Sequence, residues 1–371
     1  MPLISSLMPN LTTAATTIDE QTAELFQFHR GQDVFFMLML VAFLMMFIRR
    51  YEWGVALATL LVFATSFPLY MLAQAGIFGA AIDVELIIGA AFCAITLVIA
   101  IGVFLGHIST IAYIVVGVLF VPSYIFIEWF IFTFLDGVLD AGGSILVHMF
   151  AAYWGWGVIL GLRNKAVNDE PAATSVHSVS FVWLASMLLM VLWPSFVTAL
   201  LPPEDVIPGM VNTYLAMVAS ILVTYVLLWA LKRTIDPLVF TYAILAGGVA
   251  IGASVDLATP LQSWIIGLVA GAVSTLSFLF LDEWLRNKTG VWDTMGVHNL
   301  HGVPGIVGGL VPIVLGFAGG SQAIAVVGTL VIGLVLGGIV GLILRLFPRP
   351  TLMLDDAEAF PAEEMRATDP A

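Results

Sequence analysis

Two segments of the chain share the same spacing of aspartate, glycine and histidine, and the first and last of these can accept and donate protons. In residues 140–148 an aspartate is followed by glycine three residues later and by histidine eight residues later, and residues 293–301 repeat this order. A neutral imidazole has one donor and one acceptor nitrogen, and two such rings can share one proton in a hydrogen bond. His148 and His301 are therefore the first candidates for chemistry, and each lies inside a hydrophobic segment that an acid begins.

The elements that position these histidines must lie mostly in lipid. Hydrophobic residues make up 61% of the chain and charged residues 10%, with a mean hydropathy of +1.06, which is far from the balance of a soluble domain. The pattern predicts an all-α membrane protein with eleven transmembrane helices. We place the spans at about 33–50, 54–77, 84–106, 109–135, 140–162, 176–201, 208–231, 237–257, 261–282, 294–317 and 322–346.

The basic residues predict the orientation, because cytoplasmic loops carry an excess of lysine and arginine. With eleven spans, only Arg30 falls clearly on the other side from Arg49, Arg50, Arg163, Lys165, Lys232, Arg233, Arg286, Lys288, Arg345 and Arg349. This predicts a multi-pass protein of the cell membrane with its amino terminus outside and its carboxyl terminus in the cytoplasm. We expect residues 1–32 to form an external segment, residues 33–349 the membrane domain, and residues 350–371 an acidic cytoplasmic tail.

The same topology makes the two histidine segments run in opposite directions. Because each half has five helices, the second half is inverted in the membrane relative to the first. The sequence therefore predicts an inverted repeat, with helices 1–5 related to helices 6–10 and a final helix added. Each histidine lies eight residues from its acid, or roughly 12 Å into the bilayer at 1.5 Å per residue. In a hydrocarbon core about 30 Å thick, the two imidazoles would be about 6 Å apart along the membrane normal. We expect the rings of His148 and His301 to meet near the midplane.

Other interpretations of the histidines remain open at this stage. For either histidine alone, a structural hydrogen bond between helices is the preferred interpretation, and the matched positions are what favour function. A metal site is one alternative, but zinc usually takes a third protein ligand, and Asp140 and Asp293 are too distant. His298 is the remaining candidate, and it would point about one turn toward the cytoplasm. We therefore expect neither a metal nor another cofactor. The net charge of −13 gives no reason to expect nucleic acid binding.

Five motifs resemble those of a known family, the Rhesus branch of the ammonium transporters. They are Asp140-Ala-Gly-Gly-Ser with His148, Trp193-Pro-Ser-Phe, Asn212-Thr-Tyr, Leu245-Ala-Gly-Gly-Val-Ala, and Asp293-Thr-Met-Gly with Asn299-Leu-His-Gly. The resemblance runs from about residue 32 to residue 346. It implies eleven core helices with inverted repeats, a homotrimer with one pore in each subunit, and His148 and His301 as twin pore histidines.

The resemblance also implies roles for residues that composition alone does not distinguish. Phe92 and Phe196 match the two aromatic rings that block the outer pore entrance, although any one of the 25 phenylalanines is ordinarily a packing residue. Val297 would line the inner pore. Ammonium transporters outside the Rhesus branch have a cation-binding site of Trp and Ser outside the aromatic rings, and this chain has Glu128 and Leu200 at the matching positions. The resemblance therefore implies that the cation is recruited only weakly, by the negative charge of the vestibule.

The acids have both structural and functional interpretations. Asp140 begins a helix, so capping backbone N–H groups is its expected role, and shaping the vestibule or helping ammonium lose its proton is the alternative. Asp293 would cap a helix on the other side. Asp136 is a weaker vestibule candidate than Glu128, because an external acid is usually a solvated group.

The sequence therefore predicts transmembrane transport of ammonium or ammonia, with methylammonium as a related solute. Ammonium would lose its proton in the outer vestibule, and ammonia would pass the aromatic rings and the histidines. The alternatives are a carbon dioxide channel and an ammonium sensor. An enzyme is not expected, because the chain has no nucleophile elbow and no His-Glu-x-x-His helix.

Overall fold

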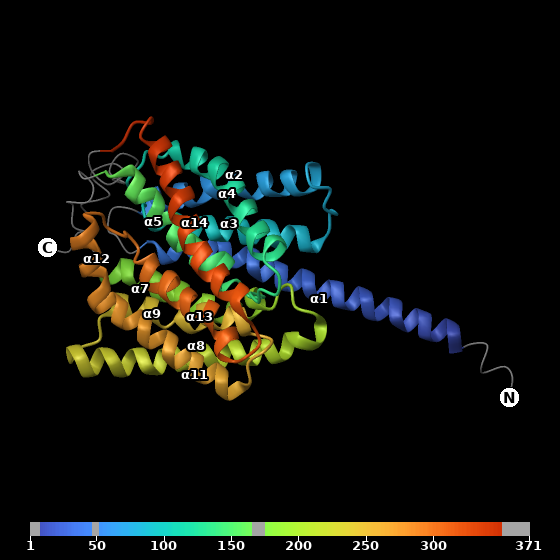
Figure 1. Ribbon diagram of the computed structural model, residues 1–371. Coiled ribbons are helices and arrows are strands. Elements are labelled where there is room, and N and C mark those ends of the chain that lie inside the picture. Colours follow the sequence, from blue (N-terminus) through green and yellow to red (C-terminus); the bar gives the residue numbers. More distant parts are fainter. Residues whose placement is uncertain (1–7, 47–51, 165–174, 351–371) are drawn as a thin grey trace.

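The described residues of the computed structural model form a bundle of helices. They comprise residues 8–46, 52–164 and 175–350, and no strand occurs among them. The predicted acidic tail lies outside the described residues from residue 351 onward. Figure 1 shows the helices packed side by side, with α1 running out of the bundle toward the amino terminus.

The first half of the bundle contains five spans. They are α1 (Met8–Leu44), α2 (Glu52–Gly76), α3 (Val84–Ile101), α4 (Ala112–Trp129) continued by the π-helix η1 (Phe130–Phe134), and the π-helix η2 (Ser144–Met149) continued by α5 (Phe150–Leu162).

The second half repeats this arrangement and adds a final helix. Its spans are α7 (Val176–Val197), α8 (Pro203–Lys232), α9 (Pro237–Ala243) with α10 (Ala246–Ile251) and the short 3₁₀-helix η3 (Gly252–Ser254), α11 (Pro260–Leu276) with η4 (Ser277–Leu281) and α12 (Asp282–Thr289), η5 (His298–Gly302) with α13 (Val303–Val314), and α14 (Gly320–Leu344).

The prediction of eleven helical spans is confirmed. Among the described residues, nine are long and apolar enough to cross a membrane by length and composition; α1 and the short η5–α13 pair complete the set. The first span was predicted to begin at residue 33, but α1 already begins at Met8. Residues 10–30 contain neither glycine nor proline, so nothing in the sequence interrupts the helix there.

The helix starts follow from short polar residues placed before apolar runs. The Asp83 carboxylate accepts a hydrogen bond from the Leu86 backbone N–H and so caps α3. Thr259 and Gln262 form a capping box at the start of α11. Such caps satisfy backbone donors that have no partner inside the helix.

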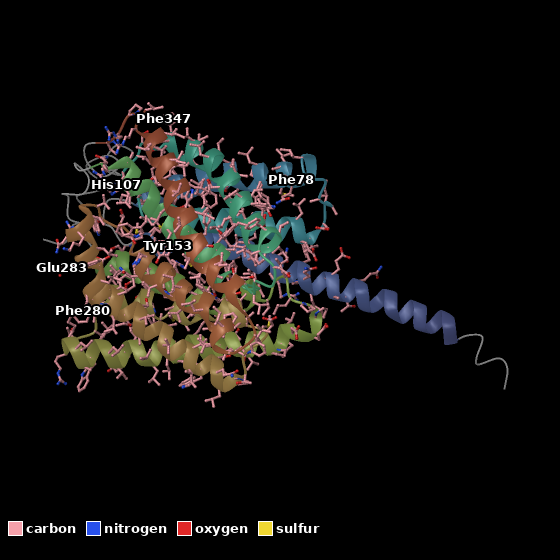
Figure 2. All side chains as sticks on the ribbon, viewed as in Figure 1. Phe78, His107, Tyr153, Phe280, Glu283 and Phe347 are labelled. Atoms are coloured by element: carbon pink, nitrogen blue, oxygen red, sulfur yellow. The ribbon has the colours of Figure 1, made fainter. Side chains whose placement is uncertain are left out.

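The helices define two opposite faces of the bundle. We call the face from which α1 projects the amino-terminal face, and the face where α14 ends the carboxyl-terminal face (Figure 1). In Figure 2, Phe78 marks the first of these, whereas His107, Glu283 and Phe347 mark the second. Because η2–α5 and η5–α13 begin at opposite faces, the histidine segments enter the bundle from opposite sides.

Glycine allows α5 and α14 to pack with their backbones in contact. A Cβ atom at Gly337 would collide with the Trp154 carbonyl oxygen, and one at Gly341 with the Val158 carbonyl oxygen. The four-residue spacing of glycines therefore serves close helix packing, as it commonly does in lipid. This contact fixes α5, and with it the position of His148.

Candidate functional site

Asp140 fixes the start of the first histidine segment. Its carboxylate accepts hydrogen bonds from the backbone N–H of Ile145, at 3.0 and 3.1 Å from the two oxygens, and of Leu146, at 2.8 Å. Gly143 between them adopts φ +76°, a conformation that costs glycine little. Asp140 is 5% exposed. The contacts are those of a cap, in which each carboxylate oxygen accepts at least one backbone N–H.

Asp293 performs the same task at the opposite face. Its carboxylate accepts hydrogen bonds from the backbone N–H of Val297 at 3.0 Å and of His298 at 2.8 Å. Gly296 has φ +64°, which matches the conformation of Gly143. The repeated Asp-x-x-Gly spacing thus produces two similar turns, each of which starts a π-helical segment.

Each turn is also joined to the other half of the protein. The Gly142 backbone N–H donates to the Gly252 carbonyl oxygen at 2.8 Å, and the Met295 N–H donates to the Gly102 carbonyl oxygen at 3.1 Å. Gly252 follows α10 and Gly102 follows α3, the third span of each half. The reciprocal contacts give the two halves equivalent roles, as in an inverted repeat.

The two histidine rings meet inside the bundle. The Nδ1 atoms of His148 and His301 are 3.1 Å apart, and the rings lie edge to edge, with centroids 5.2 Å apart and planes 15° from parallel. The side chains are 2% and 7% exposed, respectively. Nε2 of His148 has no hydrogen-bond partner in the described part of the chain. One Nδ1 must donate and the other accept for this contact to be a hydrogen bond.

The contact determines what the pair can offer to a solute. When both rings are neutral, the ring that donates through Nδ1 has an acceptor at Nε2, and its partner has an Nε2–H donor. The pair therefore presents one acceptor and one donor in an apolar surrounding. A small neutral molecule that can both donate and accept hydrogen bonds matches this arrangement, whereas a cation would lose its hydration without a counter-charge.

Aromatic rings cover the amino-terminal side of His148. Phe92 and Phe196 are packed at a centroid distance of 4.8 Å with 57° between their planes, and both are buried. The ring of Phe196 lies 5.7 Å from that of His148, and Trp193 is stacked on His148 at 5.5 Å. The sequence identified the two phenylalanines only through a family resemblance. It contained Trp193 in a quoted motif but gave it no role.

A different set of side chains lies on the carboxyl-terminal side of the histidines. The ring of His298 contacts Tyr153 edge to face at a centroid distance of 5.8 Å and Trp156 at 6.0 Å. Val297 is 5% exposed and faces Gly102, where an added Cβ would lie 2.9 Å from its Cγ2. Val297 thus packs against the end of α3, one turn before His301.

Glu128 is held in a polar cleft by hydrogen bonds from α2. Its carboxylate accepts hydrogen bonds from the Tyr70 hydroxyl at 2.9 and 3.0 Å and from Gln74 Nε2 at 3.2 Å. The cleft has a volume of about 300 Å³ and opens between α2, α3 and α4. It reaches Gly89, one helical turn before Phe92. Asp136 is exposed on the same face. Neither acid makes a hydrogen bond to a residue of the ring pair.

The acids and histidines do not gather into a metal-ligand set. In the described ranges, no group of three or more His, Cys, Asp or Glu side chains could hold a metal ion. His298 does not join His148 and His301, since its Nδ1 lies 3.4 Å from Asn299 Oδ1. Asn299 Nδ2 in turn donates to Asp282 at 2.9 Å. The third candidate ligand is therefore directed toward a different hydrogen-bond network.

Buried paired histidines between two oppositely directed halves define a multi-pass α-helical membrane protein of the transporter and channel class. The chain belongs to the Ammonium Transporter Family, which it matches over residues 10–360, and to its Rhesus-like branch. It is 32% identical over 373 residues to ammonium transporter Rh type C of Xenopus tropicalis, covering 89% of this chain and 79% of that protein. It is 35% identical over 301 residues to Rh type A of Mus musculus, covering 76% and 68%.

Solved structures agree with this assignment. The structure of Rh50 from Nitrosomonas europaea, described as one of the Rhesus family of channels, has a TM-score of 0.89 and 35% identity, covering 94% of this chain and 96% of that one. A sensor Amt protein shares the fold, with a TM-score of 0.79 at 18% identity and coverage of 90% and 96%. The chain spans only 63% of Rh type C of Bos taurus, so the curated relatives extend beyond the matched part.

Proposed function

We propose that this protein transports ammonium across the cell membrane as neutral ammonia. Ammonium reaches the outer vestibule at the amino-terminal face and gives its proton to external water. Ammonia then passes Phe92 and Phe196, moves along His148 and His301, and takes up a proton from cytoplasmic water. Membership of an ammonium transporter family supports the solute class. The path and the proton steps are our inference from the site.

One observation carries this proposal: the 3.1 Å contact between the buried Nδ1 atoms of His148 and His301. It leaves one donor and one acceptor nitrogen, and ammonia can pair with both because it has N–H groups and a lone pair. Transferring a whole charge through the same apolar region would be far more costly, since in the described part of the chain neither ring has a hydrogen bond to an acid that would compensate it. Asp140 and Asp293 are engaged with backbone N–H groups.

The aromatic pair supports selection before the histidines. Two packed rings leave no room for a hydrated cation, but a small rotation of either ring would admit a molecule of the size of ammonia. We propose that Phe92 and Phe196 form this gate and that Val297 borders the path on the cytoplasmic side. Glu128 contributes negative potential from its polar cleft rather than direct contact with the gate.

The assembly and orientation complete the proposal. We propose a homotrimer in the lipid bilayer with a pathway through each subunit, the amino terminus outside and the carboxyl terminus in the cytoplasm. Exposed apolar side chains on the helices, such as Val226 and Val335, support a surface that faces lipid or another subunit. The excess of arginine and lysine at the carboxyl-terminal face supports the orientation.

Stopped-flow measurements on proteoliposomes with an internal pH-sensitive dye test the proposal. An inward gradient of ammonia should raise the internal pH faster than in protein-free liposomes, and methylammonium should give a slower response of the same sign. Carbon dioxide supplied to the same vesicles should acidify them no faster than control liposomes. Membrane current recorded in parallel should stay at background. An ammonia response equal to that of protein-free liposomes would refute the proposed function.

A further inference from the structure

The two main vestibule acids predicted from the sequence, Asp140 and Glu128, both have hydrogen-bond partners of their own. Asp140 uses both carboxylate oxygens to cap the helix that carries His148. Glu128 is held by Tyr70 and Gln74 in its own cleft. An acid with an oxygen that has no such partner would be better placed to bind a cation that arrives at the gate.

Asp33 on α1 is such an acid. Its Oδ2 accepts a hydrogen bond of 2.6 Å from the hydroxyl of Ser195, which directly precedes Phe196 in α7. Within the described part of the chain, Oδ1 of Asp33 has no hydrogen bond, and no ion pair joins the carboxylate to Arg30. Asp33 is partly exposed and Ser195 is 8% exposed. One carboxylate oxygen thus fixes the side chain, and the other remains available.

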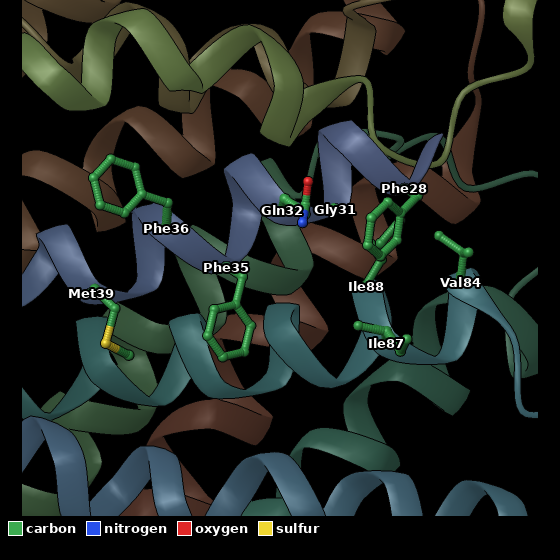
Figure 3. A pocket seen from close by; sticks show the side chains of 9 residues that line it. All are labelled: Phe28, Gly31, Gln32, Phe35, Phe36, Met39, Val84, Ile87 and Ile88. Carbon is green, nitrogen blue, oxygen red and sulfur yellow. The ribbon is translucent and has the colours of Figure 1, made fainter. Parts of the chain in front are cut away.

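The packing of α1 places Asp33 just outside the level of the gate. Gly31 lies against Ile88 of α3, where an added Cβ would be 3.2 Å from Ile88 Cγ1, and Figure 3 shows these two residues side by side. Ile88 precedes Phe92 by four residues, or about 6 Å along the helix. Because α1 and α3 both run inward from the amino-terminal face, Asp33 lies about 3 Å inward of Gly31 and about 3 Å outward of Phe92.

The two faces of α1 at this level differ in chemistry. On one side Phe28, Phe35 and Phe36 line an apolar groove of about 400 Å³ between α1 and α3 (Figure 3). On the side toward α7, Asp33 meets Ser195. An acid near the membrane core is usually directed toward the protein interior or a water-filled path, because contact with hydrocarbon is costly.

We propose that Asp33, positioned by Ser195 beside Phe196, binds ammonium at the outer side of the aromatic pair before the cation loses its proton. This inference rests on the proposed function. The free Oδ1 accepts an N–H from ammonium in a charge-assisted hydrogen bond, and the negative charge raises the local concentration of the cation. Ser195 is a positioning residue, because it acts by orienting the carboxylate.

The dependence of flux on ammonium concentration tests this role. We would measure initial rates in proteoliposomes at one external pH for the wild type, Asp33→Asn, Asp33→Glu and Ser195→Ala. Asp33→Asn should raise the half-saturating ammonium concentration about tenfold, as expected for one charge-assisted hydrogen bond, with the maximal rate within about twofold of wild type. Asp33→Glu keeps the carboxylate and should change half-saturation by less than about threefold, whereas Ser195→Ala releases the carboxylate from its position and should raise half-saturation about threefold to fivefold with the maximal rate near that of wild type.

The outcomes separate this inference from the proposed function. If Asp33→Asn saturates at the wild-type concentration, the binding role is wrong although transport stands. If Ser195→Ala lowers the maximal rate strongly and leaves half-saturation unchanged, the hydrogen bond between Ser195 and Asp33 only stabilises the position of Phe196, and the binding role is again wrong. This measurement tests the role even if Asp33→Asn does not fold. A wild-type protein without ammonia flux would instead refute the proposed function itself.

Discussion

Asp140 and Asp293 cap two helices that enter the bundle from opposite faces, and each carboxylate holds the backbone N–H groups of two consecutive residues. The equivalence explains why the acids recur at a fixed distance from the histidines. Each cap fixes a glycine turn and a π-helical segment, and the segment then directs a histidine inward. The spacing of acid, glycine and histidine is therefore one structural unit used twice.

Removing the cap at the carboxyl-terminal face should reduce stability more than transport. Asp293→Ala leaves the buried N–H groups of Val297 and His298 without acceptors. Each unsatisfied donor should lower the free energy of unfolding by about 1–3 kcal/mol. We expect a clearly lower apparent melting temperature in detergent, and ammonia flux per folded protein within about threefold of wild type. A flux lost completely from a protein of unchanged stability would show that Asp293 acts in transport.

Truncation of one ring of the proposed gate should alter flux specifically. Phe196→Ala removes the ring that contacts both Phe92 and His148, so the entrance either widens or collapses. In both cases we expect ammonia flux to change by at least about threefold. Phe240→Ala is the matched control, because Phe240 stacks on Trp183 away from the histidines. Equal and small effects of the two substitutions would remove the gate assignment.

An acid at the position of His148 should change the kind of transport. His148→Asp introduces a carboxylate where the wild type has a neutral ring, and a buried negative charge can be compensated by a passing cation. We expect ammonium-dependent membrane current above the background seen with wild type. A folded variant that conducts ammonia at the wild-type rate without current would show that this position does not control the charge of the permeating species.

His107 should make the folded state sensitive to acid. It lies between α3 and α4, is fully buried, and has no hydrogen-bond partner for either ring nitrogen among the described residues. Burial lowers the pKa of His107 from 6.5 to about 4. Because only the unfolded state binds the proton between these values, the stability present at neutral pH is lost as pH falls below about 6.5.

The loss from His107 should reach roughly 3 kcal/mol near pH 4. We would follow the apparent melting temperature of the detergent-solubilised protein from pH 7 to pH 4. His107→Phe should flatten this dependence, whereas His177→Phe, at an exposed histidine, should leave it as in wild type. Identical acid profiles for wild type and His107→Phe would contradict this assignment.

The periodic and repeated features were the ones that sequence could predict. The apolar runs determine the eleven spans, and the fixed rise of a helix turns the spacing of His148 and His301 into similar depths from opposite faces. The glycine pairs also indicate close helix packing, which Gly337 and Gly341 show against α5. These predictions need only local geometry and the thickness of the bilayer.

Contacts between distant segments could not be predicted in the same way. The bond from Ser195 to Asp33 and the stacking of Trp193 on His148 depend on how helices rotate against one another, which periodicity does not determine. Glu128 was predicted to be a vestibule acid only through the family resemblance. Its partners Tyr70 and Gln74 lie on α2, far away in the sequence, and periodicity does not predict that they hold its carboxylate.

The central claim is that His148 and His301 conduct ammonia through their paired rings. The most direct test is ammonia flux by stopped flow in proteoliposomes that contain a folded His148→Ala, His301→Ala double variant, reconstituted at the same protein density as wild type. Removing both rings takes away the donor and the acceptor in the apolar path, so we predict that flux falls at least about tenfold. Flux at the wild-type rate would show that the pair is structural and would contradict the proposed mechanism.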